Sequence, residues 1–389
     1  TILIQTDGMT SEPISSVEPN RRRSLRSWQP GDQPWELKSS TRGQQVLRDL
    51  ASNDYLGLAR HPAVIEAAAI ALDVDGVGAG GSRLITGTRP RHTRLEAELG
   101  EWLGRDHVFL FPSGFQANIA AVAALAERHT TVLADRLIHY SLLVGIRASG
   151  ARLQRFAHND LEDLERRLQR LTRNNTAPVV ISESLFSMEG TSPDLKAMAA
   201  LCARHGAQLL VDEAHGLGVL GPGGRGLCWE VDDPVHLISG TFGKAFGSGG
   251  AFLAGDAAMG ERLLQTSGAF RYTTALAPPL VAGAQAALDL IKANPQWGPT
   301  LIQRSDAWRT ALALAGWQRP AGVGPVLPLL LNSDQAALDY QQQLEQHGLL
   351  SIAIRPPTVP EGTSRLRLVL RNDLPDDSLE LLLRALAAG

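Results

Sequence analysis

The feature that most constrains the fold is a repeated pairing of short apolar segments with helical segments. Runs 108–111, 179–182 and 208–211 are almost entirely apolar, and segments with helical periodicity lie between such runs. Runs that are apolar throughout are typical of strands buried on both faces, which is the environment of a parallel sheet. The order therefore predicts an α/β fold built on a large, mostly parallel sheet.

Polar residues stand where several of these predicted strands end. Asp135, Glu183, Asp212 and Thr241 occupy such positions. Ligands of open parallel sheets bind beyond the carboxyl ends of the strands. We therefore expect the chemistry of this chain at that edge of the sheet.

A chain of 389 residues is long enough for two domains. The polar start, residues 1–20, predicts a flexible N-terminal arm, and residues 21–58 are expected to pack with the smaller domain. The repeated pattern predicts a large domain over 59–285. From 286 to 389 the pattern changes to a linking helix followed by mixed strands and helices, which indicates a smaller α+β domain.

Composition excludes several classes of protein. A net charge of −3 disfavours binding to nucleic acid or to an anionic membrane. The longest apolar run, near 114–126, is shorter than the roughly 20 residues of a spanning helix. Two cysteines, Cys202 and Cys228, make no disulfide framework and lack metal-ligand spacing, so no metal site is expected. Without a secretory signal pattern, we expect a cytoplasmic protein.

The basic residues are 33 arginines and only four lysines, Lys38, Lys196, Lys244 and Lys292. Lys244 lies in the segment TFGKAFG (241–247), between glycines and aromatic residues and directly after an apolar run. A P-loop is excluded because Ile238 and Ala245 stand where it needs glycine and a hydroxyl residue. A surface lysine in a loop is the alternative. The setting favours a desolvated amine that forms a Schiff base with an aldehyde.

Three further segments carry groups that suit a phosphorylated aromatic cofactor. Asp212 ends a predicted buried strand and could cap a helix, bind a metal or pair with a protonated pyridine nitrogen. Ser113 and Gly114 open a helix, where free N–H groups favour an anion, although an ordinary N-cap explains Ser113 equally well. His139 could stack on a flat ring or be structural. With Lys244, these are the parts needed to hold pyridoxal 5'-phosphate.

Several phrases of the chain resemble the α-oxoamine synthases, a branch of the fold-type I pyridoxal phosphate enzymes. They are NDYLGL at 53–58, FAHND at 156–160, FSMEG at 186–190, DEAHG at 212–216 and RPPTVP at 355–360. The resemblance covers most of the chain. It implies a fold-type I pyridoxal phosphate transferase with a large sheet domain and a smaller α+β domain.

The resemblance also implies a role for individual residues. Lys244 would form the Schiff base, Asp212 would pair with the ring nitrogen, His215 with the phenolic oxygen, and His139 would stack on the ring. The remaining cofactor contacts would be Gly114, Phe115, Ser187, Thr241 and, from a partner subunit, Thr274. Substrate contacts would be Asn53, Thr358, Arg367 and one arginine of residues 21–23, for which we take Arg21.

The phrase RPPTVP implies the branch member that condenses L-alanine with a pimeloyl thioester and releases carbon dioxide, in biotin biosynthesis. That reaction makes the chain an acyltransferase, and the shared site implies a homodimer. The acyl group could be bound as a thioester to coenzyme A or to an acyl carrier protein.

Other functions stay open on the sequence alone. Within the branch, glycine with acetyl-CoA or succinyl-CoA, or serine with palmitoyl-CoA, would use the same lysine motif. An aminotransferase would share the cofactor site, and a scaffold without catalysis would lack cofactor binding. A dinucleotide-binding domain is disfavoured because no Gly-x-Gly-x-x-Gly follows a first strand. The glycine-rich loop 78–83 indicates a turn or a subunit contact.

Overall fold

The structure is a computed structural model that describes residues 18–40, 45–171 and 177–388. The described residues form two compact units. The larger unit comprises the described residues of 53–304 and 322–325. The smaller unit comprises the described residues of 1–52, 305–321 and 326–389. The expected arm, 1–20, lies mostly outside the described residues.

The larger unit is built on a seven-stranded sheet with the strand order β4-β10-β9-β8-β7-β5-β6. Its strands are β4 (His107–Phe111), β5 (Thr131–Asp135), β6 (Arg152–Phe156), β7 (Val179–Glu183), β8 (Gln208–Asp212), β9 (Leu237–Thr241) and β10 (Ala251–Gly255). Strands β6, β5, β7, β8 and β9 pair in parallel, whereas β10 pairs antiparallel with both β9 and β4. The expected large, mostly parallel sheet is confirmed.

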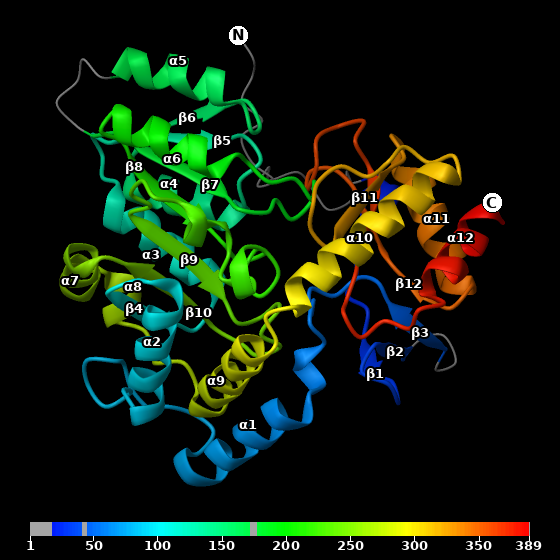
Figure 1. The fold of residues 1–389 in the computed structure, drawn as a ribbon, viewed down its shortest axis with the longest axis horizontal. Helices are drawn as coiled ribbons and strands as arrows, with labels where there is room; N and C mark the ends of the chain where they lie inside the picture. Colours follow the sequence, from blue (N-terminus) through cyan, green and yellow to red (C-terminus); the bar gives the residue numbers. More distant parts are fainter. Residues whose placement is uncertain (1–17, 41–44, 172–176, 389) are drawn as a thin grey trace. The chain divides into compact units, whose positions relative to one another are not determined.

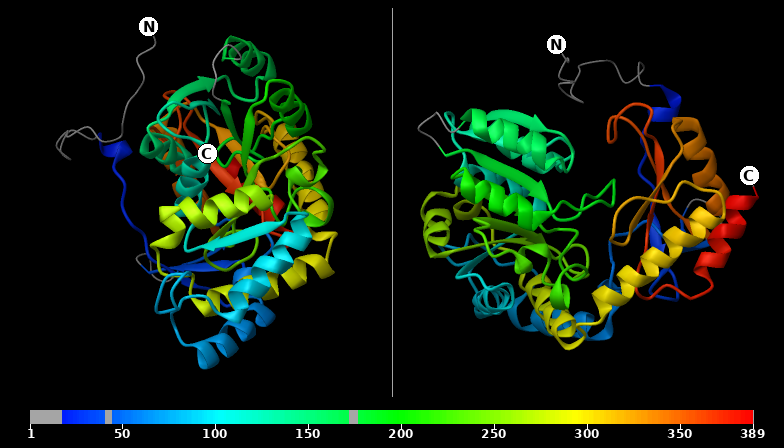
Figure 2. Two further views of the ribbon diagram at one scale, coloured as in Figure 1. Left: turned by 90° about the vertical axis from the view of Figure 1, so that its left-hand side faces the viewer. Right: turned by 45° about the horizontal axis from the view of Figure 1, so that its top comes forward.

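Helices cover both faces of this sheet, as Figures 1 and 2 show. They are α1 (Pro62–Asp75), α2 (Pro90–Leu103), α3 (Gly114–Leu125), α4 (Tyr140–Ser149), α5 (Leu161–Leu171), α6 (Leu195–Arg204), α7 (Ala257–Thr266), α8 (Gly268–Arg271) and α9 (Pro278–Ala293). The central strands have no exposed side chains, because helices pack on both sides. In the part of the chain that the structure describes, no helix is both long and apolar enough to cross a membrane.

Local capping explains where α3 and α4 begin. The Ser113 side chain accepts a hydrogen bond from the backbone N–H of Gln116 in the first turn of α3, so Ser113 is the N-cap at which the helix begins. His139 acts in the same way for α4, accepting from the N–H of Ser141. Both helices start just beyond the carboxyl ends of β4 and β5, so their N-terminal turns face the edge where a ligand is expected.

The smaller unit contains two small sheets. The first has the order β1-β2-β3-β12 and the second β11-β14-β13. Their strands are β1 (Trp28–Pro30), β2 (Glu36–Ser39), β3 (Val46–Asp49), β11 (Val326–Leu330), β12 (Leu349–Leu350), β13 (Ile352–Ile354) and β14 (Arg365–Val369). The helices are α11 (Asp334–Gln346) and α12 (Ser378–Ala387), and α10 (Trp297–Leu314) contains residues of both units.

Two features of the large sheet were not evident from the sequence. The segment RLQRF, which forms β6, carries mostly polar side chains, and four of its five residues are exposed. It is an edge strand, so it lacks the continuous apolar pattern of the central strands. Strand β10 reverses direction because only residues 242–250 join it to β9, too few for a crossover helix.

Candidate functional site

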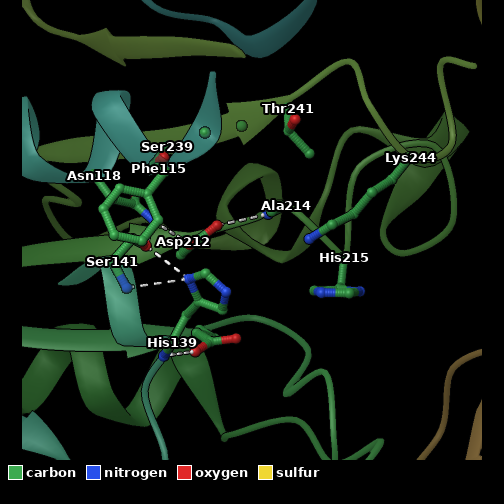
Figure 3. Close-up of a pocket in the computed structure, with 13 residues that line it drawn as sticks. Phe115, Asn118, His139, Ser141, Asp212, Ala214, His215, Ser239, Thr241 and Lys244 are labelled. Carbon is green, nitrogen blue, oxygen red and sulfur yellow. Dashed lines mark hydrogen bonds between the residues drawn. The ribbon is translucent and has the colours of Figure 1, made fainter. Parts of the chain in front are cut away.

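A cavity of about 180 Å³ lies in the larger unit at the carboxyl ends of the parallel strands. Its lining includes Glu183 at the end of β7, Asp212 at the end of β8 and Thr241 at the end of β9. His139, which precedes α4, and Lys244 complete the charged and titratable part of the wall together with His215 (Figure 3). The edge expected from the strand ends therefore does hold a cavity.

The loop that carries Lys244 is anchored by its aromatic neighbours. Phe242 and Phe246 are fully buried, and their rings meet edge to face at 5.5 Å. Gly247 has a φ of +59°, and a β-carbon there would lie 2.2 Å from the backbone nitrogen of Ala59. Lys244 itself is half-buried and extends its amine into the cavity (Figure 3). The aromatic and glycine pattern thus holds the loop down while one lysine enters the site.

Asp212 is almost fully buried, with 5% of its surface exposed. Its Oδ2 accepts a hydrogen bond of 2.7 Å from the side-chain amide of Asn118, and its Oδ1 accepts one of 2.9 Å from the N–H of Ala214. These neutral donors keep the carboxylate in one orientation. Each oxygen has a second lone pair, so the group can still bind a cationic ligand.

His139 is held from its backbone and from its ring. Its backbone N–H donates to Glu183 Oε1, and its Nδ1 lies 2.7 Å from the hydroxyl of Ser141. Burial lowers the pKa of His139; the positive charge of Lys244 lowers it further, while Asp212 opposes both effects. The imidazole therefore stays neutral over a wider pH range than a histidine in water.

Glu183 is a site residue to which the sequence assigned no role. Its carboxyl lines the cavity and is buried, with 3% of the residue exposed. Burial raises the pKa of Glu183 well above its ordinary value, and the nearby charge of Asp212 raises it further, against the effect of Lys244. The signal that could have found it was its place at the end of a predicted buried strand.

Tyr55 is a second neighbour of the site that sequence reasoning did not assign. Its hydroxyl is 2.5 Å from Nδ1 of His215 and 3.4 Å from the side-chain oxygen of Asn53. Tyr55 is fully buried and His215 is 5% exposed, so this contact fixes the imidazole at the cavity wall. Asn53 is thereby brought close to His215, although it does not line the cavity.

The start of α3 forms another wall of the cavity, with Gly114 and Phe115 in its first turn. The first N–H groups of a helix lack intrahelical partners, and the helix dipole favours an anion there. Thr241 faces the same wall: a β-carbon on Gly114 would lie 3.8 Å from its Oγ1. The Thr241 hydroxyl donates to the carbonyl of Gly250 and accepts from the N–H of Gly243. This wall suits a phosphate group.

Comparison with known proteins identifies the family. Residues 46–386 match the family model of class I and II aminotransferases. A putative 8-amino-7-oxononanoate synthase of Bordetella pertussis is 43% identical over 350 residues, 89% of this chain and 88% of that protein. The 8-amino-7-oxononanoate synthase of Chromohalobacter salexigens is 40% identical over 358 residues, 92% of each chain. The chain belongs to the class I and II aminotransferases, in the α-oxoamine synthase branch.

Solved structures of this branch have the same fold. A serine palmitoyltransferase from S. paucimobilis with a bound pyridoxal phosphate–myriocin adduct superposes with a TM-score of 0.88 at 28% identity. The match covers 94% of this chain and 92% of that one. An 8-amino-7-oxononanoate synthase from Francisella tularensis gives a TM-score of 0.76 at 26% identity, over 88% and 97% of the two chains. The predicted membership of the α-oxoamine synthases and the fold-type I architecture are confirmed.

Two predicted cofactor residues of this α-oxoamine synthase do not line the cavity. Ser187 is half-buried in the loop that follows β7. Thr274 is exposed and forms an isolated antiparallel bridge with Ser82. Their assigned roles stay predictions, and that of Thr274 involves a partner subunit.

The other predicted substrate residues belong to the smaller unit. Arg21 donates from Nε to Asp334, at 2.8 Å, and from both terminal nitrogens to Glu361, at 2.8 and 2.7 Å. Arg23, rather than Arg21, donates to the hydroxyl of Thr358, at 2.9 Å. Arg367 lies on the central strand of the three-stranded sheet and is 7% exposed.

Proposed function

We propose that this chain condenses L-alanine with a pimeloyl thioester, giving 8-amino-7-oxononanoate, carbon dioxide and a free thiol. The observation that carries the proposal is the set of Lys244, Asp212, His139 and His215 around one cavity, in a chain whose relatives are named 8-amino-7-oxononanoate synthase. This is the acyl transfer that the sequence resemblance implies.

The cavity fits pyridoxal 5'-phosphate as the cofactor. An amine, a carboxylate and a flat imidazole converge on it, and the N-terminus of α3 suits the phosphate. Lys244 would hold the aldehyde carbon, Asp212 the ring nitrogen and His215 the phenolic oxygen. Gly114, Phe115 and Thr241 would receive the phosphate, with Ser187 as a further contact. When bound, the cofactor withdraws electrons from the α-carbon of an amino acid and stabilises negative charge there.

Lys244 is the residue that we assign to proton transfer. Its amine removes the α-proton of L-alanine and returns a proton after carbon dioxide has left. This task requires an amine that can lose its proton, which arginine cannot do. Asp212, which Asn118 and Ala214 hold in one orientation, would pair with the ring nitrogen of the cofactor and favour its protonated form. His139 lines the cavity, where it would stack on the ring of the cofactor.

The sequence resemblance implies four substrate-binding residues. Arg367 would bind the carboxylate of L-alanine through two parallel hydrogen bonds. Asn53, which Tyr55 contacts, would meet the same substrate. Thr358 and an arginine of residues 21–23 would meet the acyl donor. Arg21 is the predicted residue, whereas Arg23 is the one that donates to Thr358.

We also propose that the enzyme is a homodimer with shared sites, in which Thr274 reaches the phosphate in the partner subunit. Exposed apolar side chains near Thr274 are consistent with a partner surface. Tyr272 is 81% exposed and Ile85 is 77% exposed. Large apolar side chains exposed in this way are found at subunit interfaces. Measurement of the molecular mass in solution tests the dimer.

Mass analysis of the product tests the proposed function. The purified enzyme, loaded with pyridoxal phosphate, is given alanine, glycine or serine with pimeloyl-CoA, a pimeloyl carrier protein, acetyl-CoA or palmitoyl-CoA. We expect product from alanine and a pimeloyl thioester only. Condensation of serine with palmitoyl-CoA would instead support the activity named for the S. paucimobilis structure. Transfer of the amino group to a 2-oxo acid would support an aminotransferase.

A further inference from the structure

A continuous chain of hydrogen bonds joins two residues of the cavity wall that are 73 positions apart, and its two inner members have no assigned role. Asn118 Nδ2 donates to Asp212 Oδ2 at 2.7 Å and to Ser141 Oγ at 2.9 Å. Ser141 Oγ is in turn 2.7 Å from His139 Nδ1. Asn118 is 3% exposed and Ser141 is fully buried, so water does not compete for these bonds.

The direction of each bond follows from the donors that the groups possess. The backbone N–H of Ser141 can only donate, and it donates to His139 Nδ1, so this ring nitrogen is an acceptor without a proton. The side-chain amide of Asn118 donates one N–H to Asp212 Oδ2 and the other to Ser141 Oγ. Because that hydroxyl accepts from Asn118, its own proton is free to point at His139 Nδ1.

We propose that Asn118 and Ser141 are positioning residues that fix His139 in the tautomer protonated on Nε2 and hold Asp212 in one orientation. The side-chain amide of Asn118 thereby orients the carboxylate of Asp212 directly and the imidazole of His139 through Ser141. The identity of the ligand that these two groups bind rests on the proposed function. The consequence is that the two groups are pre-organised before any cofactor binds.

Three charged or titratable groups from other elements face His139 and could compete with this arrangement. Asp212 lies on β8, Glu183 ends β7 and Lys244 follows β9. Glu183 takes the backbone N–H of His139 rather than its ring. Among the described residues, the ring of His139 forms its hydrogen bonds with Ser141, which makes Ser141 the residue that decides the tautomer.

Nitrogen NMR of histidine-labelled protein tests the tautomer directly. The two ring nitrogens differ strongly in shift when one carries the proton, and His139→Gln identifies the signals of His139. We expect Nε2–H in the wild-type chain, both without cofactor and with pyridoxal phosphate. We expect a mixture of tautomers in Ser141→Ala, because only the longer bond of 3.3 Å from the backbone N–H then remains on Nδ1. We expect a mixture in Asn118→Ala as well, because the Ser141 hydroxyl loses the donor that turns its own proton toward the ring. A proton on Nδ1 in the wild type, or an unchanged tautomer in Ser141→Ala, would overturn the proposal.

Ser182→Ala is the matched control. Ser182 is fully buried on β7, and its hydroxyl has no hydrogen-bond partner among the described residues. Its removal deletes a buried hydroxyl without touching the chain from Asp212 to His139. We expect the His139 tautomer to be unchanged in this variant. A shift as large as that of Ser141→Ala would mean that any loss of a buried hydroxyl disturbs the site.

Cofactor affinity gives a second measurement. We expect Ser141→Ala and Asn118→Ala to weaken pyridoxal phosphate binding about tenfold, because each leaves a buried polar group unsatisfied. Ser182→Ala is expected to stay within about twofold. Equal affinity in all three variants would contradict a positioning role. Failure of the proposed function would show itself separately, as absence of the expected product with the NMR result intact.

Discussion

The cavity of the larger unit and the arginine cluster of the smaller unit, residues 21–23, differ in how they stabilise charged side chains. In the cavity, Asp212 and Glu183 are buried and take hydrogen bonds from neutral amide groups. In the cluster, the Arg21 side chain is 32% exposed and pairs with the carboxylates of Asp334 and Glu361.

The difference indicates which charges serve function. A buried titratable group costs stability and is retained where its perturbed pKa or fixed charge is used. An exposed pair neutralises its charges in water and contributes little. The cavity should therefore respond to substitution through activity and pH, and the cluster through small changes in stability or substrate affinity.

Substitution of Lys244 should have the largest effect. We expect both Lys244→Ala and Lys244→Arg to lower kcat by at least about 10³-fold, because neither leaves an amine that can release its proton. Lys292→Arg, on the surface of α9, is the control and should leave kcat unchanged. Steady-state assays with alanine and pimeloyl-CoA measure this. Turnover of Lys244→Arg within tenfold of the wild type would remove the lysine from the mechanism.

Asp212→Asn should come next. The amide keeps the shape of the carboxylate but loses its charge, so we expect pyridoxal phosphate affinity to fall tenfold to about a hundredfold. Asp135→Asn is the matched control, since Asp135 is also a buried aspartate at the end of a parallel strand. It should change the stability but not the affinity. Equal losses of affinity in the two variants would show that the charge of Asp212 is not specifically used.

The pH dependence of stability tests Glu183. Because the folded state raises the pKa of Glu183, the unfolded chain ionises first as pH rises, and the wild type then loses stability. Glu183→Gln has no ionisable group and can still accept from His139. The difference in free energy of unfolding between Glu183→Gln and the wild type should therefore shift in favour of the variant as pH rises. Urea denaturation between about pH 5 and 8 measures this difference.

Glu345 offers the opposite control for that experiment. It is 1% exposed, but it is paired with Arg26 in the smaller unit. Glu345→Gln should destabilise the protein because it leaves the arginine without its carboxylate. Stabilisation in both variants, or in neither, would break the contrast between the two regions.

The arginine cluster should give the smallest effects. We expect Arg23→Gln to raise KM for the acyl donor about tenfold, because Arg23 is the residue that donates to Thr358. Arg21→Gln should chiefly lower stability by a small amount that shrinks further at high salt, because the Arg21 side chain is 32% exposed and that of its partner Glu361 is 58% exposed. A larger increase in KM from Arg21→Gln than from Arg23→Gln would support the sequence-based assignment of Arg21 to the substrate.

Much of the fold could be predicted because its elements are coded locally. The buried strands ending at Glu183 and Asp212 are continuous apolar runs, and a predicted helix begins after Ser113 as the structure has it. Strand β6 could not be found in this way, since an edge strand needs no apolar pattern. The direction of β10 depends on how its chain returns to the sheet, which composition does not record.

By itself, the sequence determined the family, the lysine loop and the strand ends that surround the cavity. These are short segments whose chemistry can be predicted because residues adjacent in the chain determine it, as Phe242 and Phe246 do for Lys244. Only the tertiary structure decided that Asn118 meets Asp212, that Tyr55 meets His215, and that Glu183 receives the N–H of His139. Those partners lie 44 to 160 positions apart, and a hydrogen bond between them exists only once the folded core brings them together.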